Sequence, residues 1–495
     1  MINKIWQIPI TAENYPFQAA DRRCHLEELG YVEEEYFMSG TANVYTEKGH
    51  DHEVEVLCPD APYTTRLLIR RPVQRERFSG NVVVEILNAS AMMDIDRMWV
   101  NTWKYLTRNG DIYIGITSKG HTIDTMKRFN SERYALLNWN NPMPEREKPE
   151  NTGTFQFLPQ YESGLYWDVQ TDLARLLRTE DTLNPIREYG KCYLYLLGWS
   201  QSGSYMARTL ASLAKDAPDG TPLFDGYLEA GADAALAPIN AYEIASSNGA
   251  IFQNGTLPKG STLLCKEPYI AINTESENRG ANWMGDLDRP EAKFRTYQIP
   301  GSSHDAWYNM EEYYEGYLQE DAAKYNCALH FSGKEGEPMD TPYHCIFAAA
   351  LRNLYVWVRE GVPAPHAPKI DTIVAGDKDF DPFSVMWEGP VMKYANRKDV
   401  FGNSTGGIRM ACLDYPVARY QSYSVREDGS FDPMYGSVYP FSVEQLRQMY
   451  GSLAHYRELV EKSAAETVAL GFLLKEDVAE YVEYTVDQAK RRGLL

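Results

Sequence analysis

The sequence predicts an α/β fold with a mainly parallel central sheet and helices on both faces. Two observations lead to this class. Short apolar or β-branched runs recur along the chain, and segments with apolar residues at helical spacing lie between them, which is the alternation of a parallel sheet. One run also leads through a tight turn directly into a helical pattern, at residues 193–210.

Strands are expected where an apolar run ends in Gly, Asn, Ser or Thr. These runs are residues 65–69, 82–87, 112–116, 193–197, 224–228, 269–272 and 295–299. Helices are expected at 167–177, at 205–210 and at 347–357. Ser442 is a plausible N-cap for the helices that complete the chain.

The length of 495 residues fits two to four domains, or one large domain with insertions, at about 100–200 residues per domain. We expect an α/β core over residues 1–310 with lid insertions near 121–164 and 233–265. The first insertion is rich in Pro, Asn and aromatic residues and exceeds the usual loop length. Residues 311–495 are expected to add a core helix and a helical C-terminal extension packed on the core.

The charge balance disfavours several classes of partner. The chain has 49 Lys+Arg against 69 Asp+Glu, a net charge of −20, and no basic run, so nucleic acids and anionic membranes are not expected partners. No stretch approaches the roughly 18 apolar residues of a membrane span, and no signal-peptide pattern opens the chain, which predicts a cytoplasmic protein. The seven scattered cysteines contain no CxxC pair and predict neither disulfides nor a zinc ribbon.

The most informative motif follows the run at 193–197. Gly198-Trp199-Ser200-Gln201-Ser202-Gly203 lies between a strand and a helix, the setting of a nucleophile elbow. Such a turn needs small residues two positions before and two positions after the nucleophile, and Gly198 and Ser202 meet this need. Ser200 is therefore the predicted nucleophile, at a helix N-terminus where the Gln201 N–H can stabilise an oxyanion.

A serine nucleophile needs a base, and His304 is the candidate. It ends a Gly/Ser loop that follows the run at 295–299. The other eight histidines lack this placement.

The base in turn needs an acid that orients it. Glu277 is the first choice because it follows the run at 269–272, in the part of the chain between nucleophile and base. Glu275 is the second choice, and Asp233 is a third. Asp305 adjoins His304 in sequence, so it is poorly placed to reach the same ring.

The second oxyanion donor is expected after the run at 82–87. The backbone N–H of Ala89 or Ser90 is the candidate, and Asn88 is expected to shape the turn. Glu85 lies within that apolar run and needs a partner if buried, for which a structural ion pair is expected.

These motifs together resemble the α/β-hydrolase superfamily. The segments GWSQSG, GYVEEEYFMSGTANVY, RLLIRRP…GNVVVEILN, IPGSSH and GNSTGGIR are similar to those of a branch of large proteins known as "alpha/beta hydrolase domain-containing". The resemblance spans nearly the whole chain and implies Ser200 as nucleophile, His304 as base and a carboxylate on the loop after Thr274. Two departures stand out: the HGGG motif of many lipases is absent, and Ser202 replaces the more usual glycine.

The predicted reaction is hydrolysis of a carboxylic ester through an acyl-enzyme. Acyl transfer, lyase or cyclase chemistry with the same triad is an alternative, as is a non-catalytic small-molecule-binding homologue. The abundant aromatic residues favour a hydrophobic or aromatic small-molecule ester. They include Trp139, Tyr161, Tyr166, Trp167, Trp283, Trp307, Tyr308, Tyr313 and Tyr314.

No cofactor or metal is expected. No Gly-x-Gly-x-x-Gly pattern follows the first strands, which gives a dinucleotide no support. His50, Asp51, His52 and Glu53 are metal-ligand types but suggest a solvated turn. Gly402 to Arg409 is Gly-rich without the spacing of a phosphate loop and is expected to be a packed turn.

Overall fold

The chain forms two compact units. The computed structural model describes residues 1–48, 52–147, 158–232, 236–242, 265–277, 285–313, 336–374, 394–426, 428–432 and 434–495. The first unit contains Met1–Tyr269, Arg289–Lys293 and Glu315–Leu329. The second contains Ile270–Asp288, Phe294–Tyr314 and His330–Leu495.

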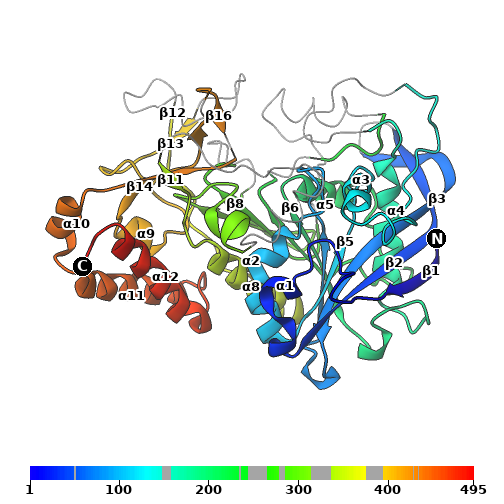
Figure 1. Cartoon of the computed structure of the whole chain (residues 1–495), viewed down its shortest axis with the longest axis horizontal. Helices are drawn as coiled ribbons and strands as arrows, with labels where there is room; N and C mark the ends of the chain where they lie inside the picture. Colours follow the sequence, from blue (N-terminus) through cyan, green and yellow to red (C-terminus); the bar gives the residue numbers. More distant parts are fainter. Residues whose placement is uncertain are drawn as a thin grey trace. The chain divides into compact units, whose positions relative to one another are not determined.

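The first unit is built on a mixed sheet in the order β1-β2-β3-β5-β4-β6-β7. Figure 1 labels β1, β2, β3, β5 and β6 of this sheet. The strands are β1 (Ile2–Ile8), β2 (Tyr31–Lys48), β3 (Glu53–Pro72), β4 (Asn81–Ile86), β5 (Ile112–Ile116), β6 (Tyr193–Trp199) and β7 (Gly226–Ala230). β4 pairs in parallel with β5 and β6, and β6 pairs in parallel with β7. The parallel centre predicted from the apolar runs is therefore confirmed. β1, β2, β3 and β5 pair antiparallel along the N-terminal edge.

Strands β2 and β3 form a long antiparallel hairpin of which the sequence predicted only residues 65–69. They span 18 and 20 residues, in a register that runs from the pair Tyr31–Pro72 to the pair Lys48–Glu53. Buried charged residues such as Glu35 and Arg66 interrupt their apolar runs. The strands therefore lack the continuous apolar pattern by which a strand is recognised.

Helices of the first unit follow its parallel strands, as predicted. α2 (Arg97–Asn109) follows β4, α3 (Thr122–Phe129) follows β5, and α5 (Gln201–Ser212) follows β6. α4 (Tyr166–Leu176) precedes β6 and confirms the helix expected at 167–177, and α1 (Asp21–Cys24) is a single turn. α5 packs on β4 and β6, while α2 packs on β5 and β6.

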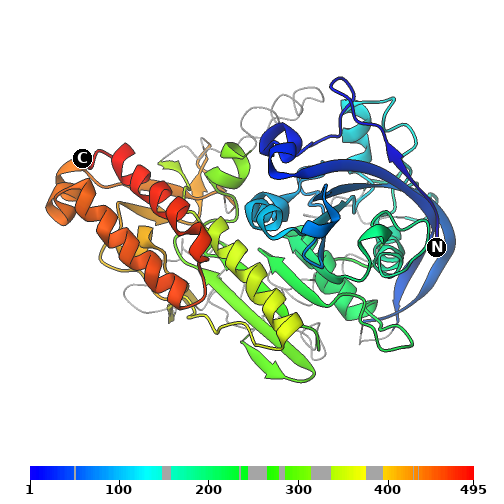
Figure 2. The same cartoon turned by 90° about the horizontal axis from the view of Figure 1, so that it is seen from below.

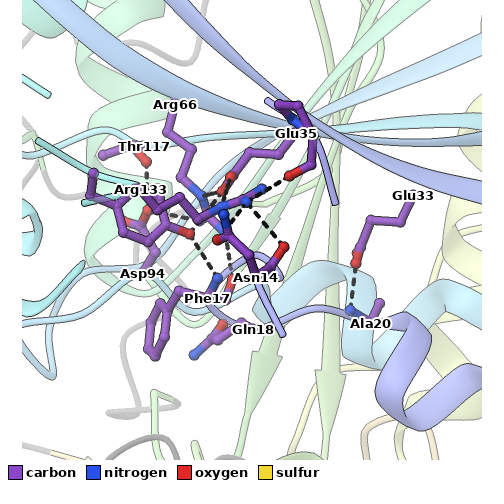
Figure 3. A network of polar contacts seen from close by, with 12 residues as sticks. Asn14, Phe17, Gln18, Ala20, Glu33, Glu35, Arg66, Asp94, Thr117 and Arg133 are labelled. Carbon is purple, nitrogen blue, oxygen red and sulfur yellow. Dashed lines mark hydrogen bonds and ion pairs between the residues drawn. The ribbon is translucent and has the colours of Figure 1, made fainter. Parts of the chain in front are cut away.

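A buried charge network holds the N-terminal segment on this sheet (Figure 3). Arg66 Nε donates to Glu35 at 2.5 Å, Arg66 Nη1 donates to Asp94 at 3.3 Å, and the Phe17 carbonyl accepts from the same guanidinium. Arg133 Nε donates to the other Glu35 oxygen at 2.6 Å. These four charged side chains are 0–6% exposed, so each charge depends on its partners for the solvation that water no longer provides.

Glu85 on β4 differs from its expectation. It forms no ion pair in the described part of the chain. Its carboxylate accepts hydrogen bonds from Met98 N, Trp99 N and Tyr113 Oη, each at 2.8 Å. Burial and the nearby Asp96 raise the pKa of Glu85 to about 8, so the carboxyl group is largely neutral at pH 7 and needs no cation. The first N–H groups of α2, which have no partner within the helix, hold it in place.

The second unit carries the C-terminal parts of the two strands that lead to the predicted acid and base. They are β8 (Tyr269–Thr274) and β10 (Ala292–Ile299), which confirm the strands expected at 269–272 and 295–299. Its other strands are short: β9 (Leu287–Arg289), β11 (Glu337–Pro338), β12 (Thr372–Val374), β13 (Tyr394–Asn396), β14 (Ala418–Gln421), β15 (Ser424–Val425), β16 (Phe431–Asp432) and β17 (Ser437–Pro440).

The C-terminal region of this unit is helical, as predicted. Its helices are α8 (His344–Glu360), α9 (Ala411–Asp414), α10 (Val443–Tyr450), α11 (Leu453–Ala469) and α12 (Val478–Arg491). Figure 2 shows α11 and α12, in orange and red, side by side. Ser442 caps α10 in a reciprocal capping box with Gln445, which confirms it as an N-cap.

Candidate active site

Ser200 occupies a strained turn between β6 and α5. Its backbone has φ 57° and ψ −121°, a conformation that L side chains rarely adopt. Ser200 N donates to Ala230 O at 2.7 Å, and Ser204 N donates to Ser200 O at 3.2 Å, so hydrogen bonds on both sides hold the turn. Ser200 is partly exposed whereas Trp199 and Gln201 are buried. The turn thus presents the hydroxyl-bearing residue outward.

The glycines of the motif are required by close backbone approach. A Cβ on Gly198 would lie 2.6 Å from the Ser202 carbonyl oxygen. A Cβ on Gly203 would lie 2.5 Å from the Ala232 Cβ and 2.8 Å from the Glu229 Cγ. All three distances, to backbone at Gly198 and to side chains at Gly203, are far below van der Waals contact, so the turn accepts no side chain at either position.

Asn88 connects the predicted oxyanion loop to this turn. Its Nδ2 donates to Trp199 O at 2.9 Å, and its Oδ1 accepts from Ser90 N at 3.0 Å and from Ser90 Oγ at 2.5 Å. Ser90 N is thereby occupied. Ala89 N has no hydrogen-bond partner among the described residues, so of the two candidate donors Ala89 is the one that is free to bind an oxyanion.

His121 fixes the other side of the same loop. Its Nε2 lies 3.0 Å from the Ala89 carbonyl oxygen, so this nitrogen carries the proton and donates. Burial lowers the pKa of His121 to about 4, although the hydrogen bond to Ala89 opposes that shift. The ring is therefore neutral at pH 7 and serves as a constant support for the Ala89 peptide.

In the second unit, His304 and Glu277 form a buried pair. His304 Nδ1 lies 2.7 Å from Glu277 Oε1, and the two residues are 2% and 7% exposed. Glu277 Oε2 accepts from Thr274 N at 2.8 Å and from Thr274 Oγ1 at 2.6 Å. Burial raises the pKa of Glu277, but His304 and these donors outweigh it, so the pKa lies below its ordinary value. An ionised Glu277 keeps the proton of His304 on Nδ1 and leaves Nε2 as the basic nitrogen.

Glu275, the second choice for the acid, points to different partners. Its carboxylate accepts from Lys398 Nζ at 2.5 Å, Ser404 Oγ at 2.7 Å and Gly301 N at 2.7 Å. Burial raises the pKa of Glu275, but Lys398 and the other donors lower it by more than burial raises it. The pKa of Glu275 therefore lies below its ordinary value. Glu275 therefore joins the loop after β8 to the loop after β10 and to the Gly-rich segment at 402–409.

The loops after β8 and β10 are joined by further hydrogen bonds. His304 N donates to Ser276 Oγ at 3.1 Å, and Ser276 Oγ donates to Ser422 O at 2.8 Å. Glu275 N donates to Ser302 Oγ at 3.3 Å. Hydrogen bonds therefore hold His304 both by its backbone N–H and by its ring.

Two lysines near the predicted residues were missed by the sequence analysis: Lys119, which is buried, and Lys398, which is partly exposed. Lys398 meets Glu275, which is 123 positions away in sequence. Lys119 lies 3.5 Å from Ser202 Oγ in the Ser200 turn. The sequence gives only one signal for Lys119, a cation that follows Thr117 and Ser118 after an apolar strand run, and none for Lys398.

The remaining candidates lie elsewhere. Trp139, Tyr166 and Trp167 are 0–1% exposed and belong to the core of the first unit. His50, Asp51, Asp233, Trp283 and Tyr314 lie outside the described residues, as does the lid segment at 233–265 except for 236–242 and 265. Within the described ranges, no group of three or more His, Cys, Asp or Glu side chains could hold a metal ion. No helix in those ranges has the length and apolar character needed to cross a membrane.

Comparison with known proteins identifies the family. A family model described as alpha/beta hydrolase domain matches residues 6–483, so the chain belongs to the alpha/beta hydrolase domain family. This finding confirms the resemblance and the fold class predicted from the sequence. No curated protein matches the sequence.

Several solved structures are similar in fold to parts of the chain. An alpha-beta serine hydrolase homologue from Coxiella burnetii is 11% identical, with 54% of this chain and 93% of that chain covered and a TM-score of 0.26. Esterase Est22 is 11% identical, with 61% and 80% covered and a TM-score of 0.30. Thermogutta terrifontis esterase 2 is 9% identical, with 52% and 83% covered and a TM-score of 0.26.

Proposed function

We propose that the protein is a serine hydrolase that cleaves a carboxylic ester through a Ser200–His304–Glu277 triad. The observation that carries the proposal is the Ser200 turn, held at φ 57° between a strand and a helix. Such strain is retained where a reactive side chain must project from the backbone. The buried His304–Glu277 pair adds a base with a fixed tautomer.

The proposed reaction has two steps. His304 Nε2 removes the Ser200 proton as Oγ attacks the ester carbonyl, and the alcohol leaves with the proton that His304 returns. Water then attacks the acyl-enzyme with the same base. The N–H groups of Gln201 and Ala89 stabilise the oxyanion in both steps, because Gln201 starts α5 and Ala89 N is unoccupied.

The proposed substrate is a small hydrophobic or aromatic ester. The aromatic content of 13% supplies many side chains that can line an apolar pocket.

The proposal also includes a domain arrangement, with an α/β core over 1–310 that carries lid insertions and a C-terminal extension over 311–495. Neither a metal nor a cofactor has a role in the proposed steps.

A panel of p-nitrophenyl esters with acyl chains of increasing length tests this function. The wild-type protein is expected to release p-nitrophenol from at least part of the panel. Ser200→Ala is expected to abolish the release, and Glu277→Gln to lower kcat by roughly 10²–10⁴-fold through loss of the correct His304 tautomer. Glu28→Gln, a change of the same kind at an exposed position, is the control and is expected to keep the wild-type kcat.

Product analysis with and without an added short alcohol separates the alternative reactions. Free acid as the main product supports hydrolysis, whereas transfer of the acyl group to the alcohol supports an acyltransferase. Saturable binding of an ester without turnover by the folded protein would support a binding homologue and contradict the proposed function.

A further inference from the structure

Lys119 is a fully buried lysine in contact with the Ser200 turn. It follows strand β5 and is 0% exposed. Its Nζ lies 2.8 Å from Ser118 Oγ, 3.5 Å from Ser202 Oγ and 4.2 Å from the centroid of the Tyr205 ring. Among the described residues no carboxylate lies within hydrogen-bonding distance of this ammonium. An apolar side chain would fill the same volume at lower desolvation cost.

The two serines that Lys119 contacts also meet one carbonyl. Ser118 Oγ donates to Leu87 O at 2.9 Å, and Ser202 Oγ donates to the same oxygen at 3.2 Å. Leu87 directly precedes the Asn88–Ala89 loop, and Ser202 is the second residue of α5. The ammonium therefore lies between two segments. One is the chain after β4 that leads to Ala89, and the other is the first turn of α5, which begins with Gln201.

We propose that Lys119 is a positioning residue for the acyl-transfer reaction. Through Ser118 and Ser202 its ammonium holds the loop of Ala89 against the start of α5, and it adds a positive charge behind the two N–H groups that bind the oxyanion. In a site of low dielectric such a charge favours the negatively charged transition state over the neutral ester. This inference rests on the proposed function and concerns the same site.

The charge state of Lys119 makes the inference testable. Burial lowers the pKa of Lys119 to about 7, and the charge of Asp94 opposes this shift only in part. The other titratable groups that face it are His121, with a pKa of about 4, and Tyr205, whose pKa burial raises. Asp94 itself is paired with Arg66. Of these three groups, Lys119 is therefore the one whose charge changes near neutral pH.

The test measures the rate at which a small fluorophosphonate labels Ser200 in the full-length protein between pH 5.5 and 9.5. The wild-type rate is expected to fall as pH rises above about 7, where the ammonium is lost. Lys119→Met is expected to react about tenfold more slowly at pH 6.5 and to lack this fall. Lys119→Arg keeps the charge, so its rate is expected to persist to pH 9.5.

Controls separate this inference from the proposed function. Lys104→Met on α2, a partly exposed lysine, is expected to match the wild type at every pH, and circular dichroism confirms that each variant is folded. If Ser200 is labelled and folded Lys119→Met keeps both the wild-type rate and its decline with pH, the role of Lys119 is wrong and the hydrolase stands. If wild-type Ser200 is not labelled at any pH, the proposed function fails and the role of Lys119 fails with it.

Discussion

At the scale of single residues, the Ser200 turn is strained, and burial sets the charge states of Lys119 and His121 near it. Ser200 has a positive φ, which costs roughly 1–3 kcal/mol for a residue with a Cβ. Gly198 and Gly203 make the close approach possible, and Asn88 holds the adjoining loop. Local sequence fixes this geometry, since the strand, the small residues and the helix are contiguous.

The strain at Ser200 predicts an unusual effect of glycine. The free energy of unfolding of Ser200→Gly is expected to equal that of the wild type or to exceed it by up to about 1 kcal/mol. The reason is that glycine adopts this φ without strain. Ser204→Gly, inside helix α5, is expected to lose about 1 kcal/mol. Urea denaturation followed by circular dichroism compares them. A loss at Ser200 equal to that at Ser204 would show that the turn is not strained.

Lys119 predicts a pH dependence of stability. Its pKa is lowered on folding, so the unfolded chain binds the extra proton between about pH 7 and the ordinary lysine value near 10.4. Wild-type stability should therefore rise from pH 7 to pH 10 relative to Lys119→Met, by roughly 2–5 kcal/mol. Urea denaturation at both pH values measures the difference. An equal difference at pH 7 and pH 10 would mean that Lys119 keeps its proton in the folded protein.

At the scale of elements, three segments of the second unit meet at the loop of His304, which is itself one of them. The loop after β8 supplies Glu277 and Glu275, the loop after β10 supplies Gly301 and His304, and the segment at 398–404 supplies Lys398. Glu275 joins all three. The Gly-rich segment expected to be a packed turn therefore helps to support the loop of His304.

The contact between Glu275 and Lys398 is expected to couple these segments. Lys398→Met leaves the Glu275 carboxylate, whose side chain is 1% exposed, without a cation and should cost roughly 3–5 kcal/mol. The double variant Glu275→Gln/Lys398→Met should lose about 1–3 kcal/mol less of the free energy of unfolding than the two single variants lose together, because residues in contact usually couple by about this amount. A double-mutant cycle in urea measures this coupling. If the losses of the two single variants simply add in the double variant, Glu275 and Lys398 do not couple these segments.

At the scale of the whole molecule, buried ion pairs between distant parts of the chain complete the first unit. Glu35 on β2 accepts from Arg66 on β3 and from Arg133, which is 98 positions away in sequence. The Phe17 carbonyl and the Asn14 carbonyl accept from the same two arginines (Figure 3). The N-terminal segment is thereby part of the folded unit and not an appended strand.

Glu35→Gln is expected to destabilise the first unit by roughly 3–5 kcal/mol, because two buried guanidinium groups lose their shared carboxylate. Glu28→Gln, at an exposed position of the same segment, should change stability by less than about 0.5 kcal/mol. Thermal unfolding of the two variants provides the comparison. A small effect at Glu35 would show that water reaches this network.

The parts of the fold that the sequence predicted are those encoded locally. The strand at Ile112–Ile116 has the expected bounds because every residue in it is buried and uncharged. β2 was missed because Glu34 and Glu35 interrupt its pattern, and their arginine partners are distant in sequence. In the same way Ser200, Glu277 and His304 follow strand ends, whereas Lys398 is brought to Glu275 only by tertiary folding.

The most direct test of the central claim is intact-mass analysis and peptide mapping after exposure to a fluorophosphonate. An activated Ser200 predicts one adduct per chain, located on the peptide of Ser200, absent in Ser200→Ala and slowed by roughly 10²–10⁴-fold in His304→Ala. No adduct on the folded wild-type protein, or an adduct that persists in Ser200→Ala, would contradict the account.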